Sequence, residues 1–399
     1  MIATKPHPRT PVIVAARRTA IGTAGRALAD VPVERLAAPV LRALLDDLAA
    51  RPAEASKDRL PPVADVILGN CMGPGGNVAR VATLAAGLGP DVPGLTLDRQ
   101  CGSGLEAITL AGSLVLAGRG DLYLAGGAES ASTAPIRAWR PKRPGDPPRP
   151  YERAPFAPPP YTDPDMGVAA DRVAQEAGVS RARQDAYAAR SHARAVAAIE
   201  AKRFAREIVP LGGVDRDERP RAGLTPERLA RLRPAYVPEA EGGTVTAGNS
   251  CGVNDGAAAV AVVPDHVRVD HGWPGLALLD WECAGSDPDR PGLGMVPAVR
   301  RLLARTGLQL DDIGAIELVE AFAGQVLACA DALGLDPDRI SPDGGTLALG
   351  HPWGASGALL LVRLFSRMVR EDGPDLGLAA VSIGGGMGVA ALVRKVPEP

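Results

Sequence analysis

The segment LTLDRQCGSGLEAITLAGSLVLAG, residues 95–118, indicates the fold class of this chain. It runs from a strand-like Leu95-Thr96-Leu97 through the glycine turn Cys101-Gly102-Ser103-Gly104 into a helix that is apolar nearly all round. A helix that is apolar on every side is buried between layers and does not lie on a surface. The segment therefore predicts an α/β protein whose core encloses helices.

The rest of the chain repeats this alternation of short apolar strands and longer helices. A second buried helix follows a glycine-rich turn near residue 350, and a second strand ends at a small nucleophilic residue followed by glycines near residue 382. Two related halves that share a five-layer core would explain the repetition. The expected strands are 12–15, 65–68, 122–125, 258–263, 276–281, 315–319 and 378–383, and the expected helices include 33–48, 105–116, 296–305 and 358–369.

The middle of the chain differs in kind from both halves. Residues 136–164 are rich in proline and arginine without a period of 2 or 3.6, which indicates an ordered loop or a covering flap. Residues 166–204 are helical in pattern, with Ser180 as N-cap of an amphipathic run. This insertion either covers an active site or is a surface excursion without a role in chemistry. The predicted units are 1–130 (first half), 131–243 (inserted loop domain), 244–275 (return to the first half) and 276–399 (second half).

Composition and charge exclude several classes of function. The net charge of -2 gives no electrostatic case for nucleic acid or an anionic membrane. No apolar stretch reaches the roughly 18 residues of a membrane span, and the first apolar run, 12–16, is too short for the core of a signal peptide. Five scattered cysteines show no CxxC spacing, so we expect reduced thiols, no metal and a cytoplasmic protein.

Cys101 is the first candidate for chemistry. A thiol at the start of a helix faces unpaired amide N–H groups and the positive end of the helix dipole, which favour the thiolate and lower its pKa. This position predicts a nucleophile. A buried, inert cysteine is the alternative, because free cysteine is among the most buried residue types.

His351 and a C-terminal glycine turn are the other candidates. His351 stands in GGTLALGHPWGASG, residues 344–357, where Pro352 favours an extended conformation and the glycines allow close packing. An imidazole held on such a turn suits a base or an oxyanion donor, unless it serves only the loop structure. VSIGGGMG, residues 381–388, can present backbone N–H groups to an anion, although glycines after a strand also serve packing alone.

These three blocks, in this order and at this spacing, resemble the thiolase family of acetyl-CoA acetyltransferases and 3-ketoacyl-CoA thiolases. The resemblance extends over the chain through RTAIG (18–22), AGGAES (125–130), LRPA (232–235), TVTAGN (244–249) and EAFA (320–323). It implies a thiolase-like αβαβα sandwich of two similar halves with an inserted loop domain, assembled as a homodimer or a dimer of dimers (homotetramer). It also implies a coenzyme A thioester as substrate and no permanently bound cofactor.

The resemblance assigns a role to each matching residue. Cys101 would carry the acyl group as a thioester, and His351 would activate it. The backbone amides of Cys101 and Gly384 would form the oxyanion hole. Met166 matches a residue of the substrate pocket, and the inserted domain would hold coenzyme A.

Several positions depart from the family pattern. Ser382 replaces a second catalytic cysteine that moves the α-proton, and a serine hydroxyl is a poor general base. Val319 replaces an asparagine that positions a water at the intermediate, and losing one such donor costs about 100- to 1000-fold in rate. Cys251 stands where a serine beside the coenzyme A pantetheine is expected, and Asp165 replaces a histidine beside Met166.

Three functions remain open from the sequence. The chain is an ordinary thiolase in which the catalytic residues His351 and Ser382 share the role of the missing cysteine, or an acyltransferase whose acceptor needs little C–H activation. As a third possibility, it is a non-catalytic or partner-dependent subunit that binds coenzyme A. The donor would be an acyl-CoA or an acyl-carrier thioester. A basic run in the proline-rich loop would meet coenzyme A phosphates or an acidic carrier, or is simply solvated. The basic residues are Arg137, Arg140, Lys142, Arg143, Arg149 and Arg153.

Overall fold

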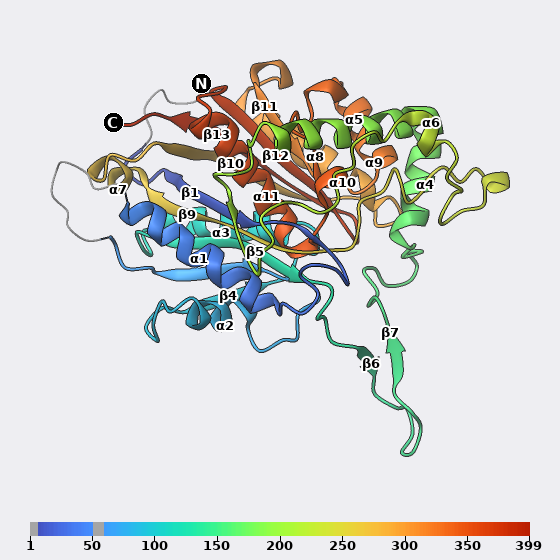
Figure 1. Ribbon diagram of the computed structural model, residues 1–399, viewed down its shortest axis with the longest axis horizontal. Coiled ribbons are helices and arrows are strands. Elements are labelled where there is room, and N and C mark those ends of the chain that lie inside the picture. Colours follow the sequence, from blue (N-terminus) through green and yellow to red (C-terminus); the bar gives the residue numbers. More distant parts are fainter. Residues whose placement is uncertain (1–6, 51–59) are drawn as a thin grey trace.

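Two apolar helices, α3 (Ser103–Leu116) and α11 (Trp353–Phe365), pack against each other in the middle of the molecule. The computed structural model describes residues 7–50 and 60–399, so the first six residues of the polar N-terminus lie outside the described residues. Both helices are covered by sheet on either side, as their all-round apolar sequences predict (Figure 1). They form the central layer of the fold.

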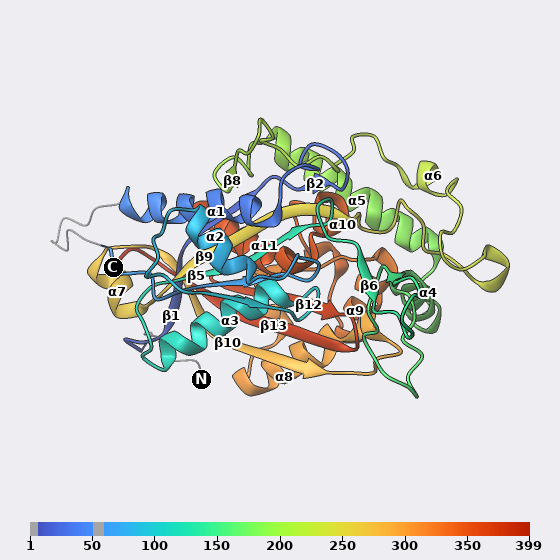
Figure 2. The ribbon, with the colours of Figure 1, turned by 90° about the horizontal axis from the view of Figure 1, so that it is seen from below.

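The five layers are helix, sheet, helix, sheet and helix (Figures 1 and 2). α1 (Val33–Ala49) and α2 (Val78–Ala85) cover the outer face of the first half of the sheet, and α8 (Met295–Thr306) covers the outer face of the second half, with α9 (Ala323–Leu333) beside α8. The fold class expected from the sequence is confirmed. The first half of the sheet contains β1 (Pro11–Thr19), β3 (Asp65–Gly69), β4 (Gly94–Leu97), β5 (Tyr123–Ser130) and β9 (Asn254–Pro264), and the second contains β10 (Gly275–Gly285), β11 (Ala315–Leu318), β12 (Leu376–Ile383) and β13 (Met387–Val396).

The two halves of the sheet are joined along one edge. Over the described residues the strands form an 11-stranded sheet in which β1 pairs with β10, through Val12 opposite Ala277 and Ile13 opposite Leu276. β2 (Gly22–Thr23) and β8 (Ile208–Val209) are short additions that pair with β9 and β1. Backbone hydrogen bonds therefore hold the halves together in addition to the packing of α3 and α11.

The order of elements is repeated between the halves. The first runs β1-α1-β3-α2-β4-α3-β5-β9, and the second runs β10-α8-β11-α9-α11-β12-β13. Where the first half has β4, the second has an isolated parallel bridge between Ile316 and Ile340. The strand β13, absent from the expected strands, completes the second half.

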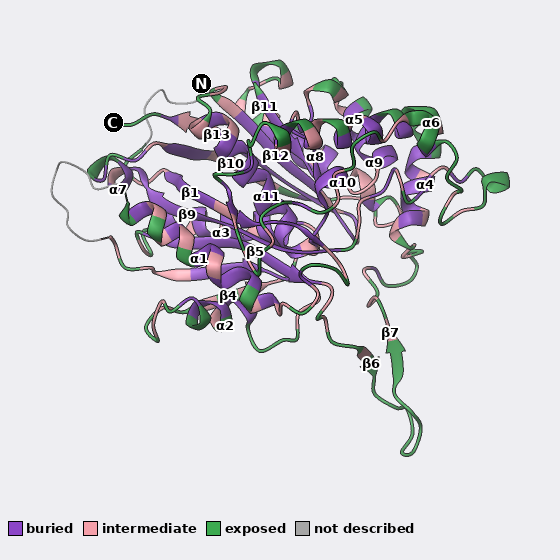
Figure 3. Cartoon of the chain, in the orientation of Figure 1, coloured by how far each residue is buried: buried purple, intermediate pink, exposed green. Residues whose placement is uncertain are grey.

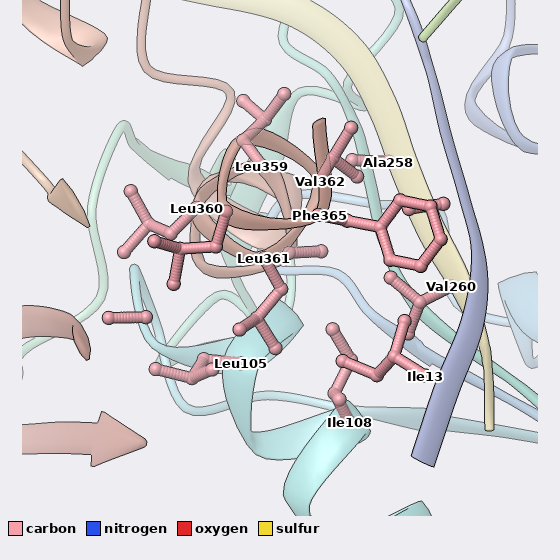
Figure 4. Close-up of a cluster of buried hydrophobic side chains, with 14 of the residues drawn as sticks. Ile13, Leu105, Ile108, Ala258, Val260, Leu359, Leu360, Leu361, Val362 and Phe365 are labelled. Carbon is pink, nitrogen blue, oxygen red and sulfur yellow. The ribbon is translucent and has the colours of Figure 1, made fainter. Parts of the chain in front are cut away.

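Apolar side chains fill the spaces between the layers, as the buried residues of Figure 3 show. Around α11 they include Leu361 and Phe365, which pack with Leu105 and Ile108 of α3 and with Val260 of β9 (Figure 4). Each large buried aliphatic or aromatic side chain contributes about 1.5–3 kcal/mol through its removal from water. The central helices are thus fixed from both sides.

Glycines set the distance between α3 and α11. A Cβ atom on Gly104 would lie 2.8 Å from the Gly354 carbonyl oxygen, and one on Gly357 would lie 2.5 Å from the Leu105 nitrogen. The helices therefore approach to a separation that side chains at these two positions would prevent. This contact brings the N-termini of the two helices together.

The insertion leaves the sandwich after β5 and returns at β9. It contains α4 (Met166–Glu176) and α5 (Arg181–Glu200), and the expected N-cap is confirmed because the Ser180 side chain accepts from the Arg183 N–H. The expectation that residues 136–164 lack regular structure is wrong in one place. β6 (Arg137–Trp139) and β7 (Arg149–Tyr151) form a hairpin that extends away from the sandwich (Figure 1).

No described helix is long and apolar enough to span a membrane. The remaining elements are short. They are α6 (Pro226–Leu229), α7 (Asp265–Asp270), α10 (Thr346–Leu349), a π-helical turn (Ser366–Arg370) and 3-10 turns at Glu239–Glu241, Pro291–Leu293, Leu310–Asp312 and Pro337–Arg339.

Candidate active site

The N-terminal ends of α3 and α11 bring Cys101 and His351 into contact. His351 Nε2 lies 3.3 Å from Cys101 Sγ, although 250 positions separate the two residues in the chain. Each residue stands just before its helix, and the close approach at Gly104 and Gly357 holds the two helix starts side by side. The structure thus brings together the two residues that the sequence singled out.

Hydrogen bonds fix the imidazole of His351. Its Nδ1 lies 2.6 Å from Ser356 Oγ, and that hydroxyl donates to the Pro352 carbonyl oxygen at 3.0 Å. Because the hydroxyl proton is used there, Ser356 Oγ accepts from Nδ1–H, which assigns the proton to Nδ1 and leaves Nε2 as the acceptor facing sulfur. Burial lowers the pKa of His351 to about 4, so the ring is neutral near pH 7. A neutral imidazole with a free lone pair at the thiol is a base ready to act.

Cys101 does not rest as the thiolate that its place before a helix predicts. Burial raises the pKa of its thiol to about 12, while hydrogen bonds from the backbone N–H groups of Cys101 and Gly384 act in the opposite direction. Desolvation wins because α3 begins only at Ser103 and the sulfur is enclosed by apolar walls. The resting pair is therefore a thiol and a neutral imidazole, and Nε2 is the acceptor that faces the thiol.

The side chain of Ser382 is held by its neighbours. Its Oγ accepts from the Met295 N–H at 3.0 Å. Burial raises the pKa of the Cys329 thiol to about 12, with the Ser382 hydroxyl hydrogen-bonded to that sulfur acting in the opposite direction. Cys329 itself donates to the Gly292 carbonyl oxygen at 3.2 Å. The serine is thus a donor and an acceptor in a small buried network, and sequence reasoning missed both Cys329 and its link to Ser382.

A cavity of about 120 Å³ opens beside the sulfur of Cys101. The predicted residues Cys101, His351, Ser382, Gly384, Met166 and Cys251 all line it. The sequence did not single out the other lining residues, although four of them, Ala321, Phe322, Trp353 and Ile383, lie inside blocks that it did recognise. The other lining residues are Ala169, Ala170, Pro291, Gly292, Ala321, Phe322, Gln325, Trp353 and Ile383.

Val319 is the exception among the predicted residues. It is 1% exposed, packs in the central hydrophobic core and is not among the described residues that line the cavity. Its position follows the last residue of β11, and its side chain packs in the hydrophobic core with residues of α11. A part for Val319 in binding the substrate stays a prediction.

Buried polar networks explain other blocks of the sequence. Glu129, in AGGAES, accepts from the N–H groups of Cys71, Met72 and Gly354, which ties β5 to the start of α11. Its side chain also accepts from Asn70 Nδ2 at 3.0 Å. The carboxylate therefore holds the helix start that carries His351, which is a positional role and not a reactive one.

Two further networks anchor the insertion to the sandwich. Arg18, in RTAIG, is fully buried and pairs with Glu207 and Asp217 at 2.7 Å each. Glu320, in EAFA, accepts from Tyr187 Oη at 2.7 Å and from Ser191 Oγ at 2.9 Å. The insertion is thus fixed by charged and polar contacts to β1 of the first half and to Glu320, just after β11, in the second.

The basic run of the proline-rich loop does not line the cavity among the described residues. Arg137 donates to the Cys71 carbonyl oxygen, and Arg153 pairs with Asp163 at 2.9 Å. The remaining four basic residues of the run are exposed on the hairpin that extends from the sandwich. Their contact with coenzyme A or a carrier stays a prediction.

The fold and the site define an α/β enzyme of two similar halves. Cys101 and His351 are in contact where α3 and α11 begin. Residues 11–266 match the thiolase N-terminal domain and residues 274–395 match the thiolase C-terminal domain. The chain therefore belongs to the thiolase family.

Individual relatives agree with this assignment over nearly the whole chain. The protein named "Putative acetyl-CoA C-acetyltransferase VraB" from Staphylococcus haemolyticus is 44% identical over 395 residues, covering 96% of this chain and 98% of its own. The protein of that name from Staphylococcus aureus strain MRSA252 is 41% identical, covering 96% and 99%. The crystal structure of the Bacillus anthracis acetyl-CoA acetyltransferase superimposes with a TM-score of 0.88 at 34% identity, covering 97% of this chain and 99% of that one.

Proposed function

We propose that this thiolase takes an acyl group from an acyl-CoA thioester onto Cys101 and passes it to a second substrate. Membership of the family makes it an acyltransferase. Which residue carries the acyl group and which acceptor receives it are proposed. The observation that carries it is the 3.3 Å contact between His351 Nε2 and Cys101 Sγ, with two backbone N–H groups directed at the same sulfur. A non-catalytic subunit would need neither the base nor the nucleophile.

The first half-reaction uses groups that are already in place. Sulfur attacks the thioester carbonyl as its proton passes to His351 Nε2, and the N–H groups of Cys101 and Gly384 stabilise the oxyanion that forms. The tetrahedral intermediate then expels the coenzyme A thiolate, which takes the proton from Nε2. The products are acyl-Cys101 and free coenzyme A, and His351 is neutral again.

The cavity favours a short acyl chain. Its volume is about 120 Å³, whereas pockets for drug-sized ligands span about 300–1,000 Å³. Met166, Phe322 and Ile383 are among the apolar side chains of its wall. We expect acetyl and other short acyl groups to be accepted, with the inserted domain and Cys251 beside the pantetheine arm.

The second half-reaction lacks the base that Claisen chemistry needs. Ser382 Oγ accepts from the Met295 N–H, and the Cys329 thiol whose pKa the Ser382 hydroxyl lowers is held protonated by burial. A proton relay from carbon through Ser382 would require a Cys329 thiolate, which burial opposes. We therefore propose an acceptor that needs little C–H activation, such as an amine, an alcohol or an already nucleophilic carbon. His351 would take its proton and return it to the departing Cys101 sulfur.

A second candidate function is C–C bond formation or thiolysis of a 3-ketoacyl-CoA. The names of the Staphylococcus relatives, at 41% and 44% identity, favour it. In that case His351 would have to perform the proton transfer that Ser382 cannot. The two candidates share the acyl-enzyme and differ only in the acceptor.

Acylation is tested by intact-protein mass spectrometry after incubation with acetyl-CoA. We expect wild type to gain one acetyl group and Cys101→Ala to gain none. The absence of an adduct on wild type, or its persistence in the alanine variant, would contradict the proposal. We further expect a cytoplasmic homodimer or dimer of dimers, which sedimentation analysis of the purified protein tests.

A further inference from the structure

The loop after the β6–β7 hairpin lies directly on the glycine turn that follows β12. A Cβ atom on Gly384 would be 2.7 Å from Phe156 Cε2 and 2.8 Å from Phe156 Cδ2. One on Gly385 would be 3.0 Å from the Phe156 carbonyl oxygen. The ring of Phe156 therefore rests against the backbone of Gly384, where no side chain larger than hydrogen fits.

Two charged residues, Arg153 and Asp163, fix the position of the Phe156 ring. The Arg153 guanidinium lies 4.5 Å from the centre of the Phe156 ring, a cation–π distance. Arg153 pairs with Asp163 at 2.9 Å, and the same carboxylate accepts from the Phe156 N–H at 3.2 Å. The three residues form a compact clamp, and the Arg153 and Asp163 side chains are only 30% and 19% exposed. The position of the ring is thus set by the insertion itself.

The two ends of the turn are held differently: the Gly386 carbonyl oxygen accepts from the Ser286 N–H at 2.7 Å, whereas the Phe156 ring is the nearest neighbour that faces Gly384. Gly385 and Gly386 adopt φ of +82° and +79°, a region that glycine reaches freely, so the turn lacks side chains that would restrict its backbone. Yet the N–H of Gly384 must point at the Cys101 sulfur, because it is one of the two donors found there. A donor serves an oxyanion only when it is held in place before the charge develops.

We propose that Phe156 is a positioning residue that presses on the Gly384 turn and keeps its N–H group aimed at the Cys101 reaction centre. This gives the insertion a role at the site that differs from a cover over the cavity. It also explains glycine at 384, which the contact with Phe156 requires. The effect of Phe156 on catalysis rests on the proposed acyl-enzyme. Its effect on the orientation of the Gly384 N–H group does not.

The test compares Phe156→Ala, Phe156→Leu and Trp139→Ala with wild type. Trp139 is a matched control, because it is an aromatic residue of the same insertion that stacks on Tyr151 within the hairpin, with ring centres 4.8 Å apart. The rate of Cys101 acetylation by acetyl-CoA is measured in single turnovers. Infrared difference spectra with carbonyl-labelled acetyl-CoA report the polarisation of the thioester carbonyl in each acetyl-enzyme, and thermal melting reports folding.

We expect Phe156→Ala to acylate about 10-fold more slowly, less than the roughly 100- to 1000-fold loss of a deleted donor. Its carbonyl band should shift toward that of a free thioester, Phe156→Leu should be intermediate, and Trp139→Ala should match wild type. If the alanine variant does not fold, the leucine variant carries the same comparison. Wild-type rates and carbonyl bands in both variants would overturn the proposal.

A second readout separates this inference from the proposed function. If wild type forms no acyl-enzyme, the proposed function fails, but alkylation of Cys101 by iodoacetamide still depends on N–H donors that stabilise the thiolate. We expect Phe156→Ala to alkylate about 3-fold more slowly at each pH from 7 to 9, equivalent to half a pKa unit, with Trp139→Ala unchanged. Equal alkylation rates in wild type and Phe156→Ala would overturn the inference on their own.

Discussion

Replacing Ser382 with cysteine supplies the group that the site lacks for removing a proton from carbon. Ser382 lines the cavity, and its Oγ lies 3.0 Å from the Met295 nitrogen. A sulfur at the same place keeps this N–H donor and faces the same space. A thiol ionises near pH 8.5 in water, whereas a serine hydroxyl stays protonated throughout the physiological range.

The size of the gain follows from the environment. A well-placed general base contributes about 100- to 10,000-fold in rate, or about 2.7–5.4 kcal/mol at 1.36 kcal/mol per factor of ten. The neighbouring Cys329 thiol has its pKa raised to about 12 by burial, and the new thiol will feel the same desolvation. We therefore expect the lower end of the range, an increase of about 100-fold in C–C cleavage.

The assay is thiolysis of a short 3-ketoacyl-CoA by coenzyme A, with wild type, Ser382→Cys and Ser382→Ala compared. Wild type and the alanine variant should be equally slow, and only the cysteine variant should gain activity. Cys101 acetylation, measured alongside, should be the same in all three, because Ser382 takes no part in it. A wild type that cleaves rapidly and loses more than 10-fold on Ser382→Ala, or a cysteine variant without any gain, would refute the reasoning.

Three further predictions follow from the same geometry. His351→Ala should slow acylation about 100- to 10,000-fold in single-turnover measurements while the melting temperature stays close to that of wild type, because the variant loses the base and little packing. Burial lowers the pKa of His351 to about 4, so the acylation rate should be flat from pH 5 to 8. It should fall only as the pH drops through about 4, where protonation removes the base. A midpoint near pH 6.5 in a pH-jump experiment would contradict this. Arg18→Met leaves Asp217 buried without its cation and Glu207 with Arg363 as its remaining cation, and it should lower the free energy of unfolding by about 3–5 kcal/mol in urea titrations. An unchanged midpoint would show that Asp217 finds another partner.

Local sequence patterns predicted much of the fold and placed Cys101 within reach of His351. The buried helices α3 and α11 carry apolar residues on every side, and this property can be read without knowledge of their neighbours. Cys101 and His351 stand at glycine-rich helix starts, so the same blocks that place the helices also place the two residues. Gly104 and Gly357 also allow α3 and α11 to approach closely. Neither sequence block shows this contact by itself, because the two glycines lie in different blocks.

What the sequence missed depends on contacts between distant segments. The raised pKa of Cys101 comes from burial by walls of both halves and the insertion, and the helix start alone predicted the opposite direction. The link between Ser382 and Cys329 joins a strand to a helix 53 positions away in the chain. The exposed β6–β7 hairpin lacks the apolar alternation by which strands are recognised, because neither of its faces is buried in the core.

The central claim is that the acyl group resides on the sulfur of Cys101 during transfer. Incubation with labelled acetyl-CoA, followed by acid quench, proteolysis and tandem mass spectrometry, locates any acetyl group to a single residue. We expect a thioester on the peptide that contains Cys101, cleaved by hydroxylamine and strongly reduced in His351→Ala. A label on Cys251, or on no cysteine at all while acetyl transfer proceeds, would contradict it.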